Sequence, residues 1–158
     1  MTNSTLCYIE KNDRLLMMHR TKKANDPNEG KWIGVGGKQE EGESPDECML
    51  REVREETGLT PLNWKCRGVV SFISDRWEQE EMFVFTAGEY TGELTGCAEG
   101  ELEWIEKTSV LNLDLWQGDR IFLELIFNDA PFFLLTLKYN GDSLVGASLN
   151  GTDIQTAV

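Results

Sequence analysis

The chain has 158 residues and an acidic composition, with 28 Asp and Glu residues against 15 Lys and Arg residues and a formal net charge of −13. This balance argues against binding to polymeric nucleic acid, which requires a basic surface, and no apolar stretch is long enough to span a membrane. The length predicts one domain over residues 1–158. The four cysteines show no zinc-ligand spacing, and without a signal-peptide pattern they predict free thiols in a cytoplasmic protein.

Apolar alternation and turn residues predict two main helices among several strands. We expect strands at residues 6–9, 15–19, 32–35, 68–73, 82–90 and 102–105, and a final hairpin formed by residues 132–139 and 144–149. The hairpin is expected to turn at Asn140 and Gly141. Residues 36–38 are expected to form a loop before the first helix, and the second helix is expected over residues 120–127. Strands mixed with helices in this way indicate a three-layer α/β fold.

The first helix has clear signals at both ends. Ser44 followed three residues later by Glu47 is a capping box, and Pro45 between them suits the first helical position. Gly58 can adopt a positive φ and end the helix. The sequence therefore predicts a helix from Pro45 to about Thr57.

Three acids of this helix share one face, because Glu52, Glu55 and Glu56 are related by three and four residues. Each like-charge pair at such spacing costs a few tenths of a kcal/mol. Arg51 offsets part of that cost through Glu55, and Glu43 lies just before the helix. A divalent cation would compensate more strongly, since carboxylate oxygens suit Mg²⁺ or Mn²⁺. The structural alternative is a solvated acidic face.

The segment from Gly37 to Leu59 reads GKQEEGESPDECMLREVREETGL. It resembles the Nudix box, G-x5-E-x7-R-E-U-x-E-E-x-G-U with U aliphatic, and every fixed position matches. A chance match has a probability of ~10⁻⁸ per start position. The resemblance to the Nudix family implies an α/β/α sandwich with a mixed sheet and a loop–helix–loop metal site. It also implies hydrolysis of a nucleoside diphosphate linked to another group.

The resemblance also assigns roles by position. The implied metal site consists of Gly37, Glu43, Glu52, Glu55 and Glu56, and the implied ion is Mg²⁺, with Mn²⁺ as the alternative. Among these residues Glu52, Glu55 and Glu56 are the metal ligands and Glu43 supports the site. Arg51 would orient the glutamates. The backbone at Gly36, Gly37 and Lys38 would approach metal and phosphate.

Three segments outside the box, residues 15–38, 99–104 and 115–119, resemble the MutT-like members of the family, which destroy oxidised purine nucleoside triphosphates. The resemblance implies hydrolysis of 8-oxo-dGTP to the monophosphate and diphosphate, a nucleotide-pool sanitation role. Its partner would be a small nucleotide and not a polymeric nucleic acid or a membrane. Two alternatives stay open: another substrate, such as ADP-ribose, a dinucleotide polyphosphate or a normal dNTP, and a nucleotide-sensing module without turnover.

Four residues are candidates for base recognition. Trp116 is expected to stack on a purine, and the Asp119 carboxylate to accept from guanine N1–H and the 2-amino group. The structural alternatives are core packing for Trp116 and an N-cap for Asp119. Phe72 is a candidate pocket wall or a core residue. Thr5 is a candidate hydrogen-bond donor to the sugar or base, or a surface threonine of the first strand.

A glutamate outside the box completes the expected catalytic group. The resemblance implies that Glu99 binds another metal ion or acts as the base. The nearby alternatives are Glu101 and Glu103, and the structural alternative is a surface glutamate. The only histidine, His19, is expected to be structural. Basic residues that could meet substrate phosphates follow it, namely Arg20, Lys22 and Lys23.

Overall fold

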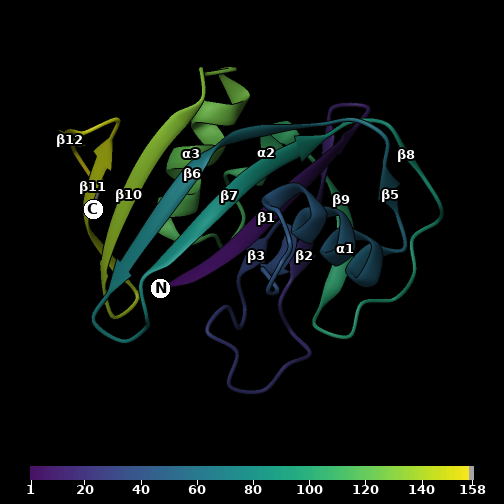
Figure 1. The fold of residues 1–158 in the computed structure, drawn as a ribbon, viewed down its shortest axis with the longest axis horizontal. Helices are drawn as coiled ribbons and strands as arrows, with labels where there is room; N and C mark the ends of the chain where they lie inside the picture. The colour runs from purple at the N-terminus through teal and green to yellow at the C-terminus, as the bar shows by residue number, and fades with distance from the viewer. Residues whose placement is uncertain (157–158) are drawn as a thin grey trace.

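The structure, a computed structural model, describes residues 1–156 and contains one large mixed sheet with few helices (Figure 1). In chain order the elements are β1 (Thr2–Lys11), β2 (Arg14–His19), β3 (Trp32–Ile33), β4 (Val35–Lys38), α1 (Pro45–Thr57), β5 (Thr60–Pro61), β6 (Trp64–Ser74), β7 (Glu80–Ala87), β8 (Tyr90–Thr91), β9 (Glu101–Glu106), α2 (Lys107–Val110), α3 (Gln117–Phe127), β10 (Phe133–Asn140), β11 (Ser143–Leu149) and β12 (Thr152–Ile154). No helix of residues 1–156 is long and apolar enough to cross a membrane.

The ten-stranded sheet has the path β12-β11-β10-β6-β7-β1-β2-β3, with β4 also paired to β1 and β9 to β2. The sheet is mixed because β1 runs parallel to β7, and β6 parallel to β10, while the other pairs are antiparallel. The hairpin of β10 and β11 forms as predicted, with Gly141 at a φ of 61° in its turn.

Alternation along β1 separates two buried clusters on opposite faces of the sheet. Tyr8 packs in the cluster that contains Phe122 of α3, whereas Cys7 packs in the cluster that contains Val53 of α1. Figure 1 shows α1 in front of the sheet and α3 behind it. The predicted α/β/α sandwich is thereby confirmed.

Helix α1 has the ends that its sequence predicted. The Ser44 side chain accepts a hydrogen bond from the Glu47 backbone at 3.2 Å, and the Glu47 side chain accepts one from the Ser44 backbone at 3.0 Å. Gly58 has a φ of 80° and donates its N–H to the Arg54 carbonyl at 2.9 Å. Because both caps are local, they fix the register of the acidic residues on the helix.

Two expectations about the preceding segment are wrong. Residues 36–38 form part of strand β4 rather than a loop, because β4 pairs with β1 and Gly36 lies opposite Leu6. A Cβ on Gly36 would lie 1.9 Å from the Thr5 carbonyl oxygen, so glycine permits this close pairing. The expected strand at 32–35 is also divided: β3 pairs with β2, whereas β4 pairs with β1.

The expected strand at 82–90 is similarly divided, because β7 ends at Ala87 and β8 pairs with β5 in a separate two-stranded sheet. The short elements β5, β8, α2 and β12 were not predicted. Each has four residues or fewer. Segments of that length do not show a periodicity that sequence analysis could detect.

Candidate active site

Arg51 holds the acidic residues of α1 in place. Its Nε and Nη2 atoms donate to the two carboxylate oxygens of Glu43 at 2.6 and 2.9 Å. Its Nη1 atom lies 2.8 Å from Glu52 and 3.4 Å from Glu55. The bonds from Arg51 lower the pKa of Glu43 to about 2. Arg51 also donates to the Lys38 carbonyl at 3.1 Å, which ties the helix to β4.

Glu52 lies directly against strand β4. A Cβ on Gly37 would lie 2.5 Å from the Glu52 Cδ atom, so any larger residue there would force this carboxylate to move. Burial raises the pKa of Glu52, and Arg51 opposes that shift. The glycine that opens the box therefore has a physical purpose: it lets a carboxylate approach the backbone of the neighbouring strand.

Glu56 has a different environment, because no Lys or Arg within residues 1–156 bonds to it. Its Oε2 atom accepts a hydrogen bond from the Gly36 backbone at 3.1 Å. Burial and the facing Glu99 carboxylate raise the pKa of Glu56 to about 8, and the Gly36 bond opposes the shift only in part. The structure thus brings Glu56 of the helix and Glu99 of a distant loop together, and Glu52 adds to the same negative field.

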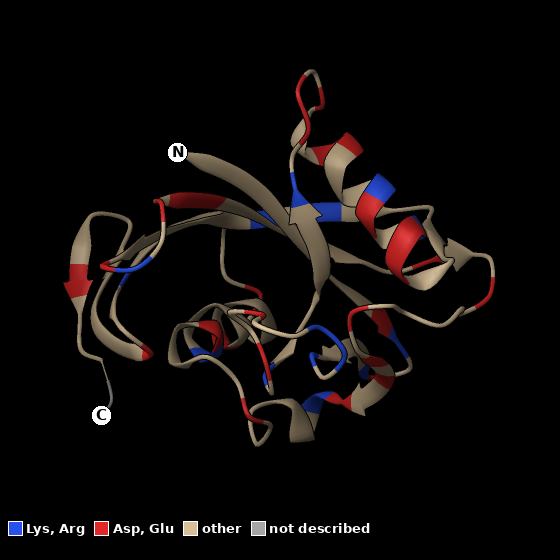
Figure 2. Ribbon diagram, turned by 90° about the horizontal axis from the view of Figure 1, so that it is seen from below, with Lys and Arg blue, Asp and Glu red and all other residues tan. Residues whose placement is uncertain are grey.

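The donor set is suited to a hard divalent cation, since it consists of carboxylate oxygens that repel one another. Glu56, Glu99 and Glu52 would hold such an ion, and Glu55, with 60% of its side chain exposed, lies at the solvent side. Within residues 1–156, no three His, Cys, Asp or Glu side chains form a ready-made ligand cage. Such a cage does not form because Glu43 and Glu52 point toward the Arg51 guanidinium instead. Figure 2 shows acidic and basic positions side by side along α1.

Arg20 was expected to meet substrate phosphates, but in the structure it pairs with carboxylates. Its Nη1 atom donates to Glu99 at 3.0 Å, and its Nε atom donates to Asp26 at 2.6 Å in a buried pair. The structure makes Arg20 a partner of Glu99 rather than a free cation. Lys22 also has partners, since it donates to the Cys97 carbonyl at 3.1 Å, while Lys23 is exposed and its phosphate role stays a prediction.

The other candidates near Glu99 differ in the contacts that they make. Glu99 is the glutamate that faces Glu56, whereas Glu101 pairs with Lys22 at 3.6 Å. His19 is structural, as expected. Its Nε2 atom lies 3.2 Å from the Gly30 carbonyl oxygen, and its ring stacks on Trp32 with centroids 4.4 Å apart.

A group of aromatic side chains lies on the α3 side of the sheet and includes two predicted residues. Trp116 meets Tyr139 edge-on with ring centroids 5.7 Å apart, and Phe72 stacks on the same Tyr139 at 6.4 Å. The Trp116 Nε1 atom donates to Asn28 at 2.8 Å, and the Lys31 ammonium lies 5.2 Å from the Trp116 ring centroid. Tyr139 was not predicted from the sequence, because its place in this group depends on the pairing of β10 with β6.

Asp119 is buried beside this group, with 5% of its surface exposed. Its side chain does not cap α3, where Trp116 is the N-cap residue, so the N-cap alternative is wrong. Burial raises the pKa of Asp119 to about 7, and Lys31 opposes the shift. A buried carboxyl next to an aromatic side chain is suited to reading the polar edge of a planar ligand.

Thr5 lies apart from this group, and its contact with the base stays a prediction. It alternates with Leu6 and Tyr8 and therefore points to the α1 face of the sheet. Its hydroxyl lies 3.4 Å from the Cys48 Sγ atom, and the residue is 2% exposed. Thr5 thus helps to fix α1 on the sheet.

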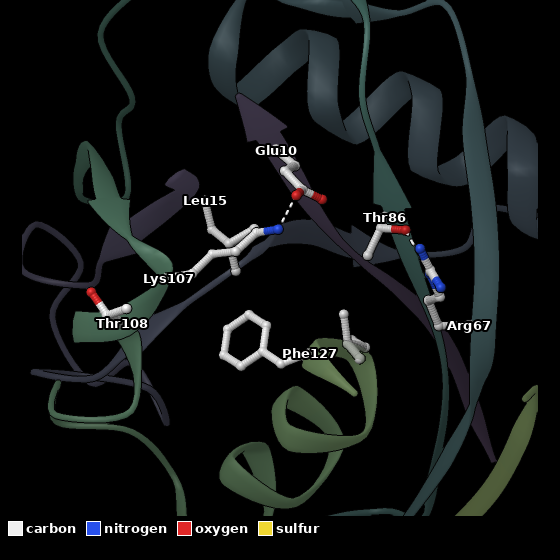
Figure 3. A pocket seen from close by; sticks show the side chains of 8 residues that line it. Glu10, Leu15, Arg67, Thr86, Lys107, Thr108 and Phe127 are labelled. Carbon is white, nitrogen blue, oxygen red and sulfur yellow. Dashed lines mark hydrogen bonds and ion pairs between the residues drawn. The ribbon is translucent and has the colours of Figure 1, made fainter. Parts of the chain in front are cut away.

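A hollow of about 280 Å³ lies elsewhere, and its lining contains none of the predicted site residues. It is lined by Glu10, Leu15, Arg67, Thr86, Lys107, Thr108, Ile126 and Phe127 (Figure 3). Its charged groups are already paired: Lys107 with Glu10, and Arg67 with Asp129 at 2.8 Å. This hollow is thus separate from Glu52, Glu55, Glu56 and Glu99, which we call the acidic cluster.

The fold and this cluster define a class of protein: an α/β/α sandwich that presents glutamates from one capped helix beside a glycine-containing strand. The NUDIX domain family model matches residues 2–126, and the chain belongs to the Nudix family. It is similar to an uncharacterized Nudix hydrolase, YvcI, of Bacillus subtilis, with 35% identity over 140 residues and 85% of each chain covered.

Two further similarities point to the MutT type. The oxidized purine nucleoside triphosphate hydrolase of Mus musculus is 28% identical over 125 residues, which cover 78% of this chain and 80% of the mouse protein. The crystal structure of a MutT protein from Bacillus halodurans has a TM-score of 0.86 and 31% identity, covering 95% of this chain and 98% of that one. The chain is thus a Nudix hydrolase of MutT type. Enzymes of this family generally use divalent metal ions and act on small nucleotides.

Proposed function

We propose that this enzyme hydrolyses 8-oxo-dGTP to 8-oxo-dGMP and diphosphate in the presence of Mg²⁺, acting on the nucleotide pool of the cytoplasm. The observation that carries the proposal is the Glu56–Glu99 pair. Two partly buried carboxylates face each other there, and in the described part of the chain no Lys or Arg bonds to Glu56. The similarity to the mouse hydrolase supports the substrate.

A bound Mg²⁺ would neutralise phosphate charge and lower the pKa of the attacking water. Glu52, Glu56 and Glu99 would hold it, with Glu55 approaching from solvent. Arg51 fixes Glu52 at 2.8 Å and so restricts its orientation. The proton of the water would pass to the Glu56–Glu99 pair, because Glu55 is exposed and lies at the edge. Fixed charges of this kind contribute most of the catalysis in phosphoryl transfer.

The aromatic group would hold the base. Trp116 would stack on the purine, and Asp119 would accept hydrogen bonds from N1–H and the 2-amino group, a pattern that adenine lacks. A buried acceptor left unpaired by the wrong base costs about 1–3 kcal/mol, which supplies discrimination. Lys23 and the backbone at Gly36 and Gly37 would contact the phosphates.

The main alternative is a different substrate for the same chemistry, such as ADP-ribose. An ADP-ribose pyrophosphatase of Methanocaldococcus jannaschii is 40% identical over 63 residues, or 40% of this chain. Glu52 and Asp119 are 67 positions apart (119 − 52), so a 63-residue match does not include both. The longer match to the mouse hydrolase favours the purine triphosphate.

A substrate panel tests the proposal. The values of kcat/KM with Mg²⁺ are compared for 8-oxo-dGTP, dGTP, 2-hydroxy-dATP and ADP-ribose, and the products are separated by ion-exchange chromatography. We expect the highest value for 8-oxo-dGTP, with monophosphate and diphosphate as products. A preference for ADP-ribose would replace the proposed substrate, and absence of hydrolysis with either Mg²⁺ or Mn²⁺ would favour a sensing module.

A further inference from the structure

Residues 20–31 connect β2 to β3, and hydrogen bonds link them to the loop that carries Glu99. Arg20 donates to the Glu99 carboxylate at 3.0 Å, and the Lys22 backbone donates to the Glu99 carbonyl at 3.3 Å. The Lys22 ammonium donates to the Cys97 carbonyl at 3.1 Å. Side chain and backbone of Glu99 are therefore both held by this one segment.

Asp26 connects the two halves of the segment. Its Oδ2 atom accepts from Arg20 at 2.6 Å, and its Oδ1 atom accepts from the Asn28 backbone at 3.1 Å. The Arg20 and Asp26 side chains are 9% and 2% exposed. A buried, charge-assisted pair of this kind has well-defined geometry, and removal of one partner leaves the other charge uncompensated. Arg20 and the Asn28 backbone therefore donate to the same carboxylate.

The far end of the segment holds Trp116. The Asn28 side-chain oxygen accepts from the Trp116 indole at 2.8 Å. Lys31 pairs with Asp114 at 2.9 Å and lies over the Trp116 ring, and the Trp32 backbone donates to the Asp114 carbonyl at 2.9 Å. The segment thus also holds the residue proposed to stack on the base.

We propose that these contacts, running from Trp116 through Asn28, Asp26 and Arg20 to Glu99, couple base stacking to the position of the Glu99 carboxylate. This inference rests on the proposed function. In this coupling, Asn28, Asp26 and Arg20 are positioning residues that do not touch substrate. A base seated on Trp116 holds Asn28 and Asp26, and Arg20 then keeps Glu99 facing Glu56. The correct base would raise kcat and not only affinity.

A double-mutant cycle at the Asn28–Trp116 contact tests the coupling. Asn28→Ala removes the acceptor, Asn28→Asp keeps it, and Trp116→Phe keeps an aromatic ring without the N–H donor. We expect Asn28→Ala to lower kcat for 8-oxo-dGTP about tenfold with KM within about twofold, and Asn28→Asp to restore most of it. In the Trp116→Phe background, Asn28→Ala should have no further effect on kcat.

Glu29→Ala is the matched control, because Glu29 is exposed in the same segment and its side chain makes no hydrogen bond or ion pair within residues 1–156. It should leave kcat and melting temperature unchanged. If Asn28→Ala lowers only the melting temperature or raises only KM, the coupling is overturned while the proposed function stands. If the wild-type enzyme hydrolyses none of the four nucleotides, the proposed function fails and the inference fails with it.

Discussion

Replacement of Asp119 by asparagine separates the electrostatic and recognition roles of this buried carboxyl. Asp119→Asn keeps the size of the side chain and removes its titration. In the folded protein, burial raises the pKa of Asp119 from its ordinary value of 3.8 to about 7. The folded state therefore holds a proton that the unfolded state has already released between those two values.

The sign of the effect follows from proton linkage. Because the unfolded chain binds fewer protons than the folded protein from about pH 4 to about pH 7, the contribution of Asp119 to stability falls over that range and is then constant. A pKa difference of this size changes the free energy of unfolding by on the order of 4 kcal/mol. Asp119→Asn should therefore gain stability relative to wild type as pH rises to about 7.

Urea unfolding of both proteins at several values between pH 4 and pH 8 measures this difference. We expect the free energy of unfolding of the variant, minus that of wild type, to increase up to about pH 7 and then to level off. On the same variant, kcat/KM for 8-oxo-dGTP should fall on the order of 30-fold, equivalent to about 2 kcal/mol. A difference independent of pH would refute the buried-carboxyl reasoning, and unchanged kinetics would remove Asp119 from base recognition.

Three further substitutions test the acidic cluster and its surroundings. Glu56→Gln relieves repulsion with Glu99, so the metal-free variant should melt at a higher temperature while kcat falls at least 100-fold; retention of more than about a tenth of kcat would contradict a metal role. Gly37→Ala brings a Cβ to 2.5 Å from Glu52, and we expect kcat measured with saturating Mg²⁺ to fall at least tenfold. Thr5→Val should leave kcat/KM within about twofold, since the hydroxyl faces α1; a tenfold loss would support a contact of Thr5 with the base.

The helix and its acids could be predicted from sequence because their determinants are local. Ser44 and Glu47 cap α1 within one turn, and Gly58 ends it. The spacing of the glutamates on a capped helix then sets which of them share a face. The Nudix box is also a local pattern, so the match at its fixed positions could identify the family from the sequence.

The features that could not be predicted from the sequence concern contacts between distant segments. Gly36 has no strand propensity of its own, and β4 forms only because β1 lies beside it. The face on which Thr5 lies depends on strand register, which a one-residue shift would reverse. The partners of Trp116 include Asn28, which is 88 positions away. Sequence separation on this scale leaves no periodic signal.

Diphosphate release from 8-oxo-dGTP by the chelator-treated enzyme, before and after addition of Mg²⁺, measures whether hydrolysis depends on a metal ion. We predict no release without the ion, release of one diphosphate for each 8-oxo-dGMP formed after its addition, and at most a hundredth of that rate for Glu56→Gln. Release that is unaffected by the chelator, or equal in wild type and Glu56→Gln, would contradict a metal-dependent mechanism at the Glu56–Glu99 pair.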